Sequence, residues 1–254
     1  GGHLLVYSPV IDVNRPLVET VLQHIQQGMD ILNVPLIRLV LDMRSSTSLQ
    51  PHTIPPNTII YDAHSAEALS HGEDMYTPLH EVGHVKSFGM GLPLVITDRA
   101  NNTNWALHPD EVLHHIDAPL REGLRPHILD GTATSVIPEV VADLLVTRHP
   151  EFWNAFLDWA CREWDCRPTV VKTPQEEFHR ACGDMRLLVT LQQVATPLPP
   201  TLRSVPHLLH GHRQSSHLVQ RVYEALRPLS LFLTAETVLN TTIALARIFA
   251  NHIL

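Results

Sequence analysis

Apolar side chains follow two different spacings along this chain, and the change from one to the other falls near residue 77. Short runs of branched and aromatic residues at 4–7, 36–41 and 58–61 predict strands. Between the first two runs, apolar side chains recur at every fourth position, which predicts a helix through Leu17, Val21, Ile25 and Met29. The polar segment 45–56 predicts a loop. Residues 1–70 therefore predict a small mixed sheet backed by a helix.

From Thr77 onward the helical spacing dominates. Helices are expected at 78–88, 109–116, 136–147, 151–164, 174–194, 214–226 and 230–252. The proline-rich segment 196–200 predicts a rigid connector. The fold class is therefore expected to be α+β, in one domain of two subdomains that share a cleft. The N-terminal α+β subdomain is expected over 1–90 and a mainly helical C-terminal subdomain over 91–254.

The composition indicates a folded core and argues against nucleic acid and membrane-spanning roles. The chain has 254 residues, 44% of them hydrophobic, which is enough apolar material for a buried core. The formal charge is −8, from 18 basic and 26 acidic side chains, so nucleic acid is not expected as a partner. The apolar stretch 229–254 contains Glu236, Asn240, Arg247 and Asn251, which favours a buried helix over a membrane span. Gly1-Gly2-His3 shows no signal-peptide pattern, and cytoplasmic and secreted locations both stay open.

Histidine is unusually frequent, with 18 residues, as many as Lys and Arg together. Imidazole titrates near neutrality and binds metals, so the count suggests either a pH response or metal chemistry. The three cysteines, Cys161, Cys166 and Cys182, contain no Cys-x-x-Cys pair and predict neither a disulfide framework nor a thiolate zinc site.

The segment 77–84, Thr-Pro-Leu-His-Glu-Val-Gly-His, favours metal chemistry over a pH response. On a helix, His80 and His84 lie on one face, one turn apart, where they can bind the same metal ion. Glu81 lies about 100° around the helix from His80, close enough to act on a water at the metal. Thr77 as N-cap and Pro78 at the first helical position would start this helix just before the ligands.

This His-Glu-x-x-His pattern resembles the motif that defines the zincin metallopeptidases. In the metzincin branch, a glycine and a third histidine follow, but Ser87 and Met90 stand at those places, which disfavours that branch. The gluzincin branch instead takes its third ligand from a Glu-x-x-x-Asp motif on a later helix. Glu139 and Asp143 fit that pattern, in the Glu-x-x-Ala-Asp form.

The gluzincin resemblance implies a set of site residues. His80, His84 and Glu139 would bind one Zn²⁺ per chain, and Asp143 would accept a hydrogen bond from a ligand histidine. Other ligands in place of Glu139 stay open: His108, Glu111, His114, His115, Asp117 and Glu122.

Gluzincins also stabilise the transition state with a donor from their later helical part. His217 and Tyr223 are the first candidates for this role, because they fall on an expected helix. The remaining candidates are His207, His210, His212 and Arg221 in the same region, and Tyr61 and Tyr76 nearer the N-terminus.

The resemblance implies a zinc-dependent peptidase with a zincin-like fold, in which Glu81 is the general base and the partner is a peptide or protein substrate. Two alternatives stay open. One is a metal-binding regulator or interaction protein that keeps the zincin scaffold without general proteolysis. The other is a latent or highly selective protease.

Overall fold

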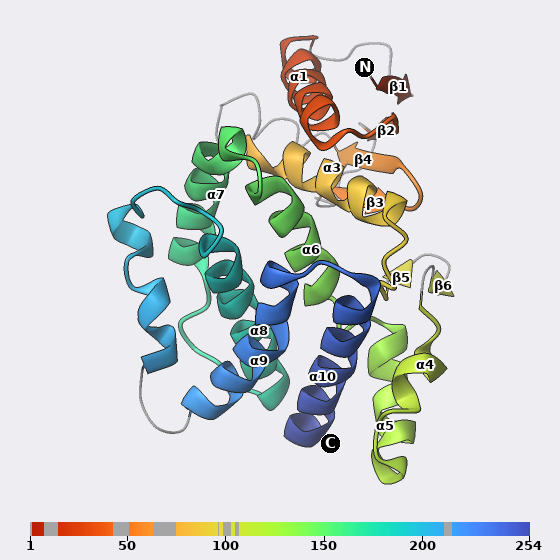
Figure 1. Ribbon diagram of the computed structural model, residues 1–254, viewed down its shortest axis with the longest axis vertical. Helices are drawn as coiled ribbons and strands as arrows, with labels where there is room; N and C mark the ends of the chain where they lie inside the picture. Colours follow the sequence, from red (N-terminus) through yellow and green to blue (C-terminus); the bar gives the residue numbers. More distant parts are fainter. Residues whose placement is uncertain are drawn as a thin grey trace. The chain divides into compact units, whose positions relative to one another are not determined.

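A computed structural model describes residues 2–7, 15–42, 51–62, 75–95, 97–98, 103–104, 107–210 and 215–254 (Figure 1). The chain divides into two compact units. The first comprises Gly1–Met90 together with Leu145–Trp159, and the second comprises Gly91–Leu144 together with Ala160–Leu254. Helices and a mixed sheet are both present, which confirms the α+β class.

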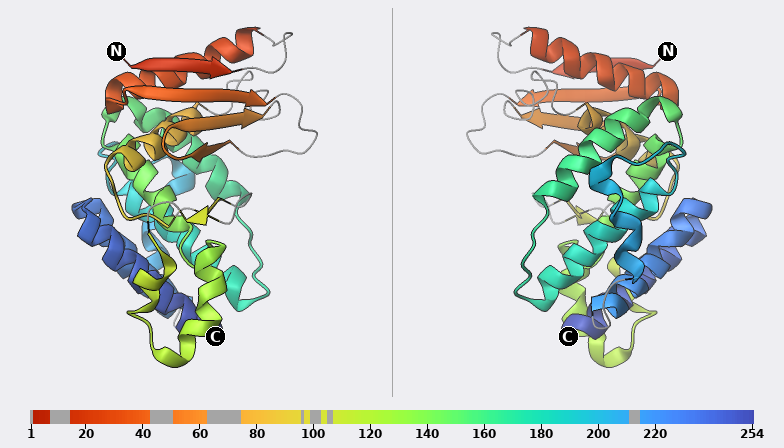
Figure 2. Two further views of the ribbon diagram at one scale, coloured as in Figure 1. Left: turned by 90° about the vertical axis from the view of Figure 1, so that its right-hand side faces the viewer. Right: turned by 90° about the vertical axis from the view of Figure 1, so that its left-hand side faces the viewer.

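The first unit contains a four-stranded sheet in the order β1-β2-β4-β3 (Figure 2). Strands β1 (His3–Tyr7), β2 (Leu36–Asp42) and β4 (Thr58–Asp62) are parallel, and they confirm the three strands expected from sequence. Strand β2 is central, and its alternate residues Ile37, Leu39 and Leu41 are buried.

The fourth strand, β3 (His52–Ile54), pairs antiparallel with β4. The loop expected over 45–56 is therefore wrong at these three residues, and 45–50 lie outside the described part of the chain. A strand of three residues is too short to show an alternation of apolar and polar side chains. It forms because it can pair with the edge of β4.

Two helices of the first unit, α1 (Arg15–Leu32) and α3 (Tyr76–Gly89), pack side by side, and α3 also contacts β3 and β4. Val21, Ile25 and Met29 on α1 are buried, as their fourfold spacing predicts. The two helices approach closely at Gly28, where an added Cβ would lie 3.2 Å from Cγ2 of Val82. Helix α3 is buried on nearly all sides, as a helix enclosed by other elements should be, although several of its buried side chains are polar.

The rest of the described chain is almost entirely helical. Its elements are the short hairpin β5 (Thr97–Asp98) and β6 (Thr103–Asn104), followed by α4 (Pro109–Leu113), α5 (Ala118–Leu129), α6 (Val136–Thr147), η1 (Pro150–Phe152), α7 (Trp153–Cys166), α8 (Pro174–Leu191), η2 (Pro200–Leu202), η3 (Val205–His210), α9 (Ser215–Leu231) and α10 (Ala235–Ile253). The expected helices are found with ends shifted by a few residues. Helix α5 was not expected, because it contains Pro126 and buries only Leu124 and Ile128.

Helix α10 packs against four other helices of the second unit, α4, α5, α8 and α9. Its Phe249 meets Phe178 of α8 edge to face, with ring centroids 5.1 Å apart. The Thr241 hydroxyl donates to the Ala225 carbonyl of α9 at 3.1 Å. None of the described helices is long and apolar enough to cross a membrane. The three cysteines are free thiols.

Candidate metal centre

Helix α3 carries the His-Glu-x-x-His motif in its first half. His80, Glu81 and His84 are 8%, 4% and 7% exposed, so all three polar side chains are buried. The helix starts at Tyr76, with Met75 as N-cap and no capping side chain. The predictions of Thr77 as N-cap and Pro78 as the first helical residue are therefore wrong, because both lie inside the helix. Groups this polar are buried only where they have partners.

The two histidines point their rings at each other, as their four-residue spacing predicts. Nε2 of His84 lies 3.0 Å from Nε2 of His80, at hydrogen-bond distance, where one ring nitrogen donates and the other accepts according to the tautomers. Tyr76 and Phe88 continue the same face of α3, with their rings 6.0 and 6.3 Å from those of His80 and His84. The histidine pair therefore lies within an aromatic stripe.

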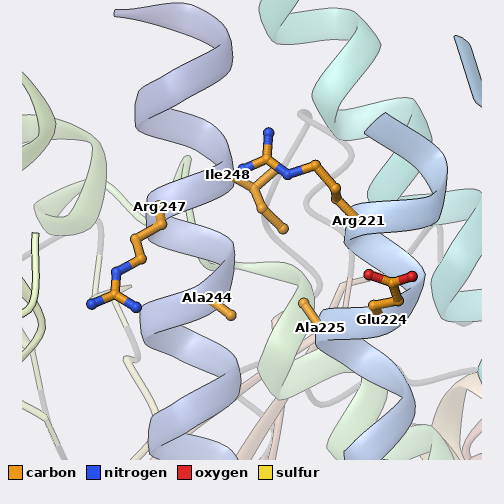
Figure 3. A pocket seen from close by; sticks show the side chains of 6 residues that line it. All are labelled: Arg221, Glu224, Ala225, Ala244, Arg247 and Ile248. Carbon is orange, nitrogen blue, oxygen red and sulfur yellow. The ribbon is translucent and has the colours of Figure 1, made fainter. Parts of the chain in front are cut away.

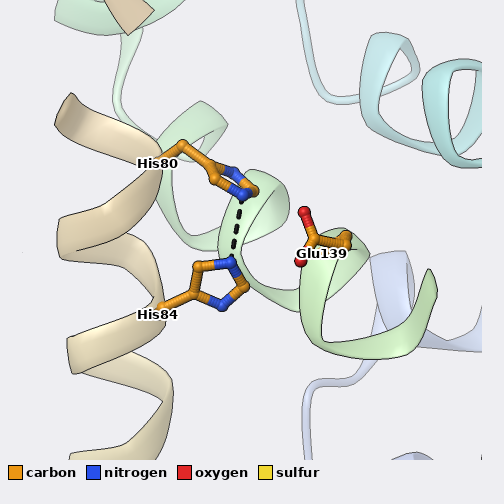
Figure 4. Close-up of side chains that lie close together, drawn as sticks. All are labelled: His80, His84 and Glu139. Carbon is orange, nitrogen blue, oxygen red and sulfur yellow. Dashed lines mark hydrogen bonds between the residues drawn. The ribbon is translucent and has the colours of Figure 1, made fainter. Parts of the chain in front are cut away.

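Glu139 comes from helix α6, 55 positions after His84. Leu145–Thr147, the last residues of this helix, belong to the first unit. One carboxylate oxygen of Glu139 and one ring nitrogen from each of His80 and His84 all lie within 4.8 Å of one another (Figure 4). Among the described residues, this trio is the group that could hold a metal ion.

The donor set fits zinc. Two imidazole nitrogens and one carboxylate oxygen form a ligand set that catalytic zinc uses, with bonds of about 2.0–2.2 Å. In a tetrahedral site such bonds separate ligand atoms by about 3.3–3.6 Å, by simple geometry. The observed 3.0 Å between the two nitrogens is close to that separation, and 4.8 Å is the upper limit for the trio.

An arginine of α8 holds the carboxylates of α6. Arg186 donates from Nε to Asp143 Oδ2 at 2.6 Å, and its Nη1 lies 3.3 Å from Oε2 of Glu139. Asp143 is fully buried, so the guanidinium supplies the charge that a buried carboxylate requires. That Asp143 accepts a hydrogen bond from a ligand histidine stays a prediction. No local pattern in the sequence indicated Arg186, which follows Asp143 by 43 positions.

Glu81 has a partner that the sequence also did not indicate. The Thr53 hydroxyl, on strand β3, lies 2.5 Å from Oε2 of Glu81. Both residues belong to the first unit. The carboxylate of Glu81 is thus held from a strand 28 positions earlier in the chain.

The alternative ligands lie on α4 and α5, in the turn between them and, for His108, just before α4. All six are exposed, and none joins the trio among the residues that the structure describes; they are His108, Glu111, His114, His115, Asp117 and Glu122. His108 instead caps α4, where its Nδ1 accepts from the Asp110 amide at 3.2 Å. Of the seven candidates for a third ligand, Glu139 is the one that groups with His80 and His84 in the described part of the chain.

The candidate transition-state donors lie on α9, in the second unit. His217 is exposed, and Tyr223 is half-buried with its hydroxyl accepting from Nε2 of Gln192 at 2.9 Å. Tyr61 and Tyr76 are buried in the first unit. His212 and the side chain of His210 lie outside the described part of the chain. The role of a donor stays a prediction for His217 and Tyr223.

A hollow of about 330 Å³ lies on the second unit, between α9 and α10 (Figure 3). It is lined by Arg221, Glu224, Ala225, Ala244, Arg247 and Ile248. The guanidinium of Arg247 turns away from α9 and donates to the His115 carbonyl at 2.7 and 3.0 Å. With one acidic and two basic side chains that do not converge, the hollow defines no ligand chemistry.

Comparison of the chain with protein-family models, with curated proteins and with solved structures gave no match.

Proposed function

We propose that this protein is a zinc-dependent peptidase, in which His80, His84 and Glu139 bind one zinc ion and Glu81 acts as general base. The observation that carries the proposal is the trio of ligand atoms within 4.8 Å of one another, drawn from the His-Glu-x-x-His helix and a second helix. The resemblance to gluzincins adds support, because it indicated Glu139 from the motif alone. A trio with one open position is typical of catalytic rather than structural zinc.

Zinc bound there would supply a Lewis acid that lowers the pKa of water and polarises a peptide carbonyl. Glu81 would accept the proton of the attacking water and then pass it to the leaving amine. This residue is suited to that task because it lies one position along α3 from His80 and is 4% exposed. Burial limits bulk water around the carboxylate, which accepts a hydrogen bond from Thr53.

The Glu81→Gln substitution tests the proposal most directly. The amide keeps the size of the side chain and leaves all three zinc ligands in place, but it cannot serve as a base. We expect one zinc per chain in both proteins and a loss of peptide hydrolysis of about 10²-fold to 10⁴-fold in the variant. Metal content by mass spectrometry and digestion of a peptide library measure the two quantities.

His80→Ala serves as the matched control, since it removes a ligand and leaves Glu81 intact. It should lose both zinc and hydrolysis. Wild-type protein that is purified without chelators and contains no zinc would contradict the proposal. A protein that holds zinc but cleaves no peptide would instead favour a metal-binding regulator on the same scaffold.

A further inference from the structure

The contact between Thr53 and Glu81 is short and specific. Oγ1 of Thr53 lies 2.5 Å from Oε2 of Glu81 and 3.3 Å from the main-chain oxygen of the same residue. A hydroxyl has one proton to donate, and the shorter distance directs it to the carboxylate. Hydroxyl–carboxylate distances of 2.5–2.7 Å are typical of charge-assisted hydrogen bonds, about twice as strong as neutral ones.

Strand pairing explains why Thr53 faces the helix. Thr53 stands opposite Ile59 of β4 in the antiparallel ladder, and directly opposed residues share a face of the sheet. Ile59 is fully buried, and α3 packs against both strands. His52 and Ile54 point to the other face because side chains alternate along a strand. Of the three residues of β3, Thr53 alone has its side chain on the face shared with Ile59.

We propose that Thr53 is a positioning residue for the general base, an inference that rests on the proposed function. By donating to Oε2, Thr53 fixes the plane of the Glu81 carboxylate and assigns Oε1 as the oxygen that takes the proton from water. The same hydrogen bond persists when Oε1 is protonated, so the base keeps its orientation while it passes the proton to the leaving amine. A base held in this way loses little freedom during the reaction.

Thr53→Val and Thr53→Ser separate this role from simple packing. Valine keeps the shape of the side chain but lacks the hydroxyl, whereas serine keeps the donor. We expect Thr53→Val to lower kcat about 10-fold to 100-fold, with KM within about twofold and zinc content unchanged. Thr53→Ser should restore most of kcat.

Thr58 provides the matched control on the neighbouring strand. Its side chain is half-buried like that of Thr53, and the structure gives it no side-chain hydrogen bond to the described residues. Thr58→Val should therefore keep the wild-type kcat. A Thr53→Val variant with unchanged kcat, or a Thr53→Ser variant as slow as Thr53→Val, would overturn the inference.

A measurement on chelator-treated protein tests the contact without any activity. Thr53→Val should lower the midpoint of urea unfolding, and the shift should vanish in a Glu81→Ala background, where no carboxylate remains to accept the bond. Additive shifts would contradict the contact itself. If the two shifts are coupled but wild-type protein hydrolyses no peptide, the proposed function fails while the Thr53–Glu81 bond stands.

Discussion

Arg186 contacts two carboxylates that have different tasks. Its Nε donates to Asp143, which is fully buried, and its Nη1 reaches Glu139, the proposed third ligand. The two acids lie one helical turn apart on α6, where two negative charges would repel each other. A single guanidinium that contacts both carboxylates offsets that repulsion and restrains the Glu139 side chain.

Replacing Arg186 with methionine should destabilise the protein strongly. Methionine fills a similar volume but leaves the buried Asp143 carboxylate without the cation 2.6 Å away. Loss of one partner of a buried ion pair costs about 3–5 kcal/mol. Urea unfolding of chelator-treated protein measures the effect. The double variant Arg186→Met/Asp143→Leu is the control, and it should recover most of the lost stability; if it does not, packing rather than charge sets the role of Arg186.

For single residues, the sequence predicted those contacts that follow from spacing along one helix. The shared face of His80 and His84 follows from their separation by four positions on a helix, and the 3.0 Å contact confirms it. Glu139 was indicated by resemblance to a motif rather than by any physical pattern. Thr53 and Arg186 could not be found, because their partners become neighbours only through strand pairing and helix packing.

Among the elements, α1 packs against the motif helix α3, and Gly28 lies at this contact. A Cβ on Gly28 would lie 3.2 and 3.3 Å from side-chain carbons of Val82, the residue after Glu81. Gly28→Val should therefore force the helices apart and lower the free energy of unfolding by about 1–3 kcal/mol. Chemical denaturation measures this change.

Gly183 of α8 is the matched control, because it is exposed and a Cβ there would meet no atom within 4 Å. Gly183→Ala should stabilise the protein by about 0.5–1 kcal/mol through helix propensity alone. Destabilisation at both positions, or at neither, would contradict the close approach at Gly28.

Helices and strands whose apolar residues recur at regular spacing could be predicted from the sequence. Those that depend on contacts with other elements could not. Helix α6 was expected over 136–147 and is observed there, because its sequence is mostly apolar and too long for a strand. Strand β3 depends on the edge of β4, and helix α5 lies mostly exposed with a proline inside. At the start of α3, the Thr-Pro signal was misleading, since the helix begins at the buried Tyr76, before both residues.

At the scale of the whole molecule, only the folded chain brings the proposed ligands together, because they lie far apart in the sequence. Zinc binding should therefore raise the stability of the folded state. His84 and Glu139 are 55 positions apart, so an unfolded chain cannot hold the three ligand atoms together without a large loss of entropy. A ligand that binds only the folded state adds about 2.7 kcal/mol of stability at a concentration 100 times its Kd. We therefore expect Tm of the chelator-treated protein to rise steadily with added zinc.

Glu139→Ala shows whether this rise depends on all three ligands. With two histidines remaining, the variant should need a much higher zinc concentration to reach the same increase in Tm. Added magnesium should leave Tm unchanged in both proteins, because Mg²⁺ prefers oxygen ligands to imidazole. Differential scanning calorimetry over a zinc titration supplies the data. Equal responses of wild type and Glu139→Ala would show that Glu139 is not a ligand, while His80 and His84 could still form a weaker site.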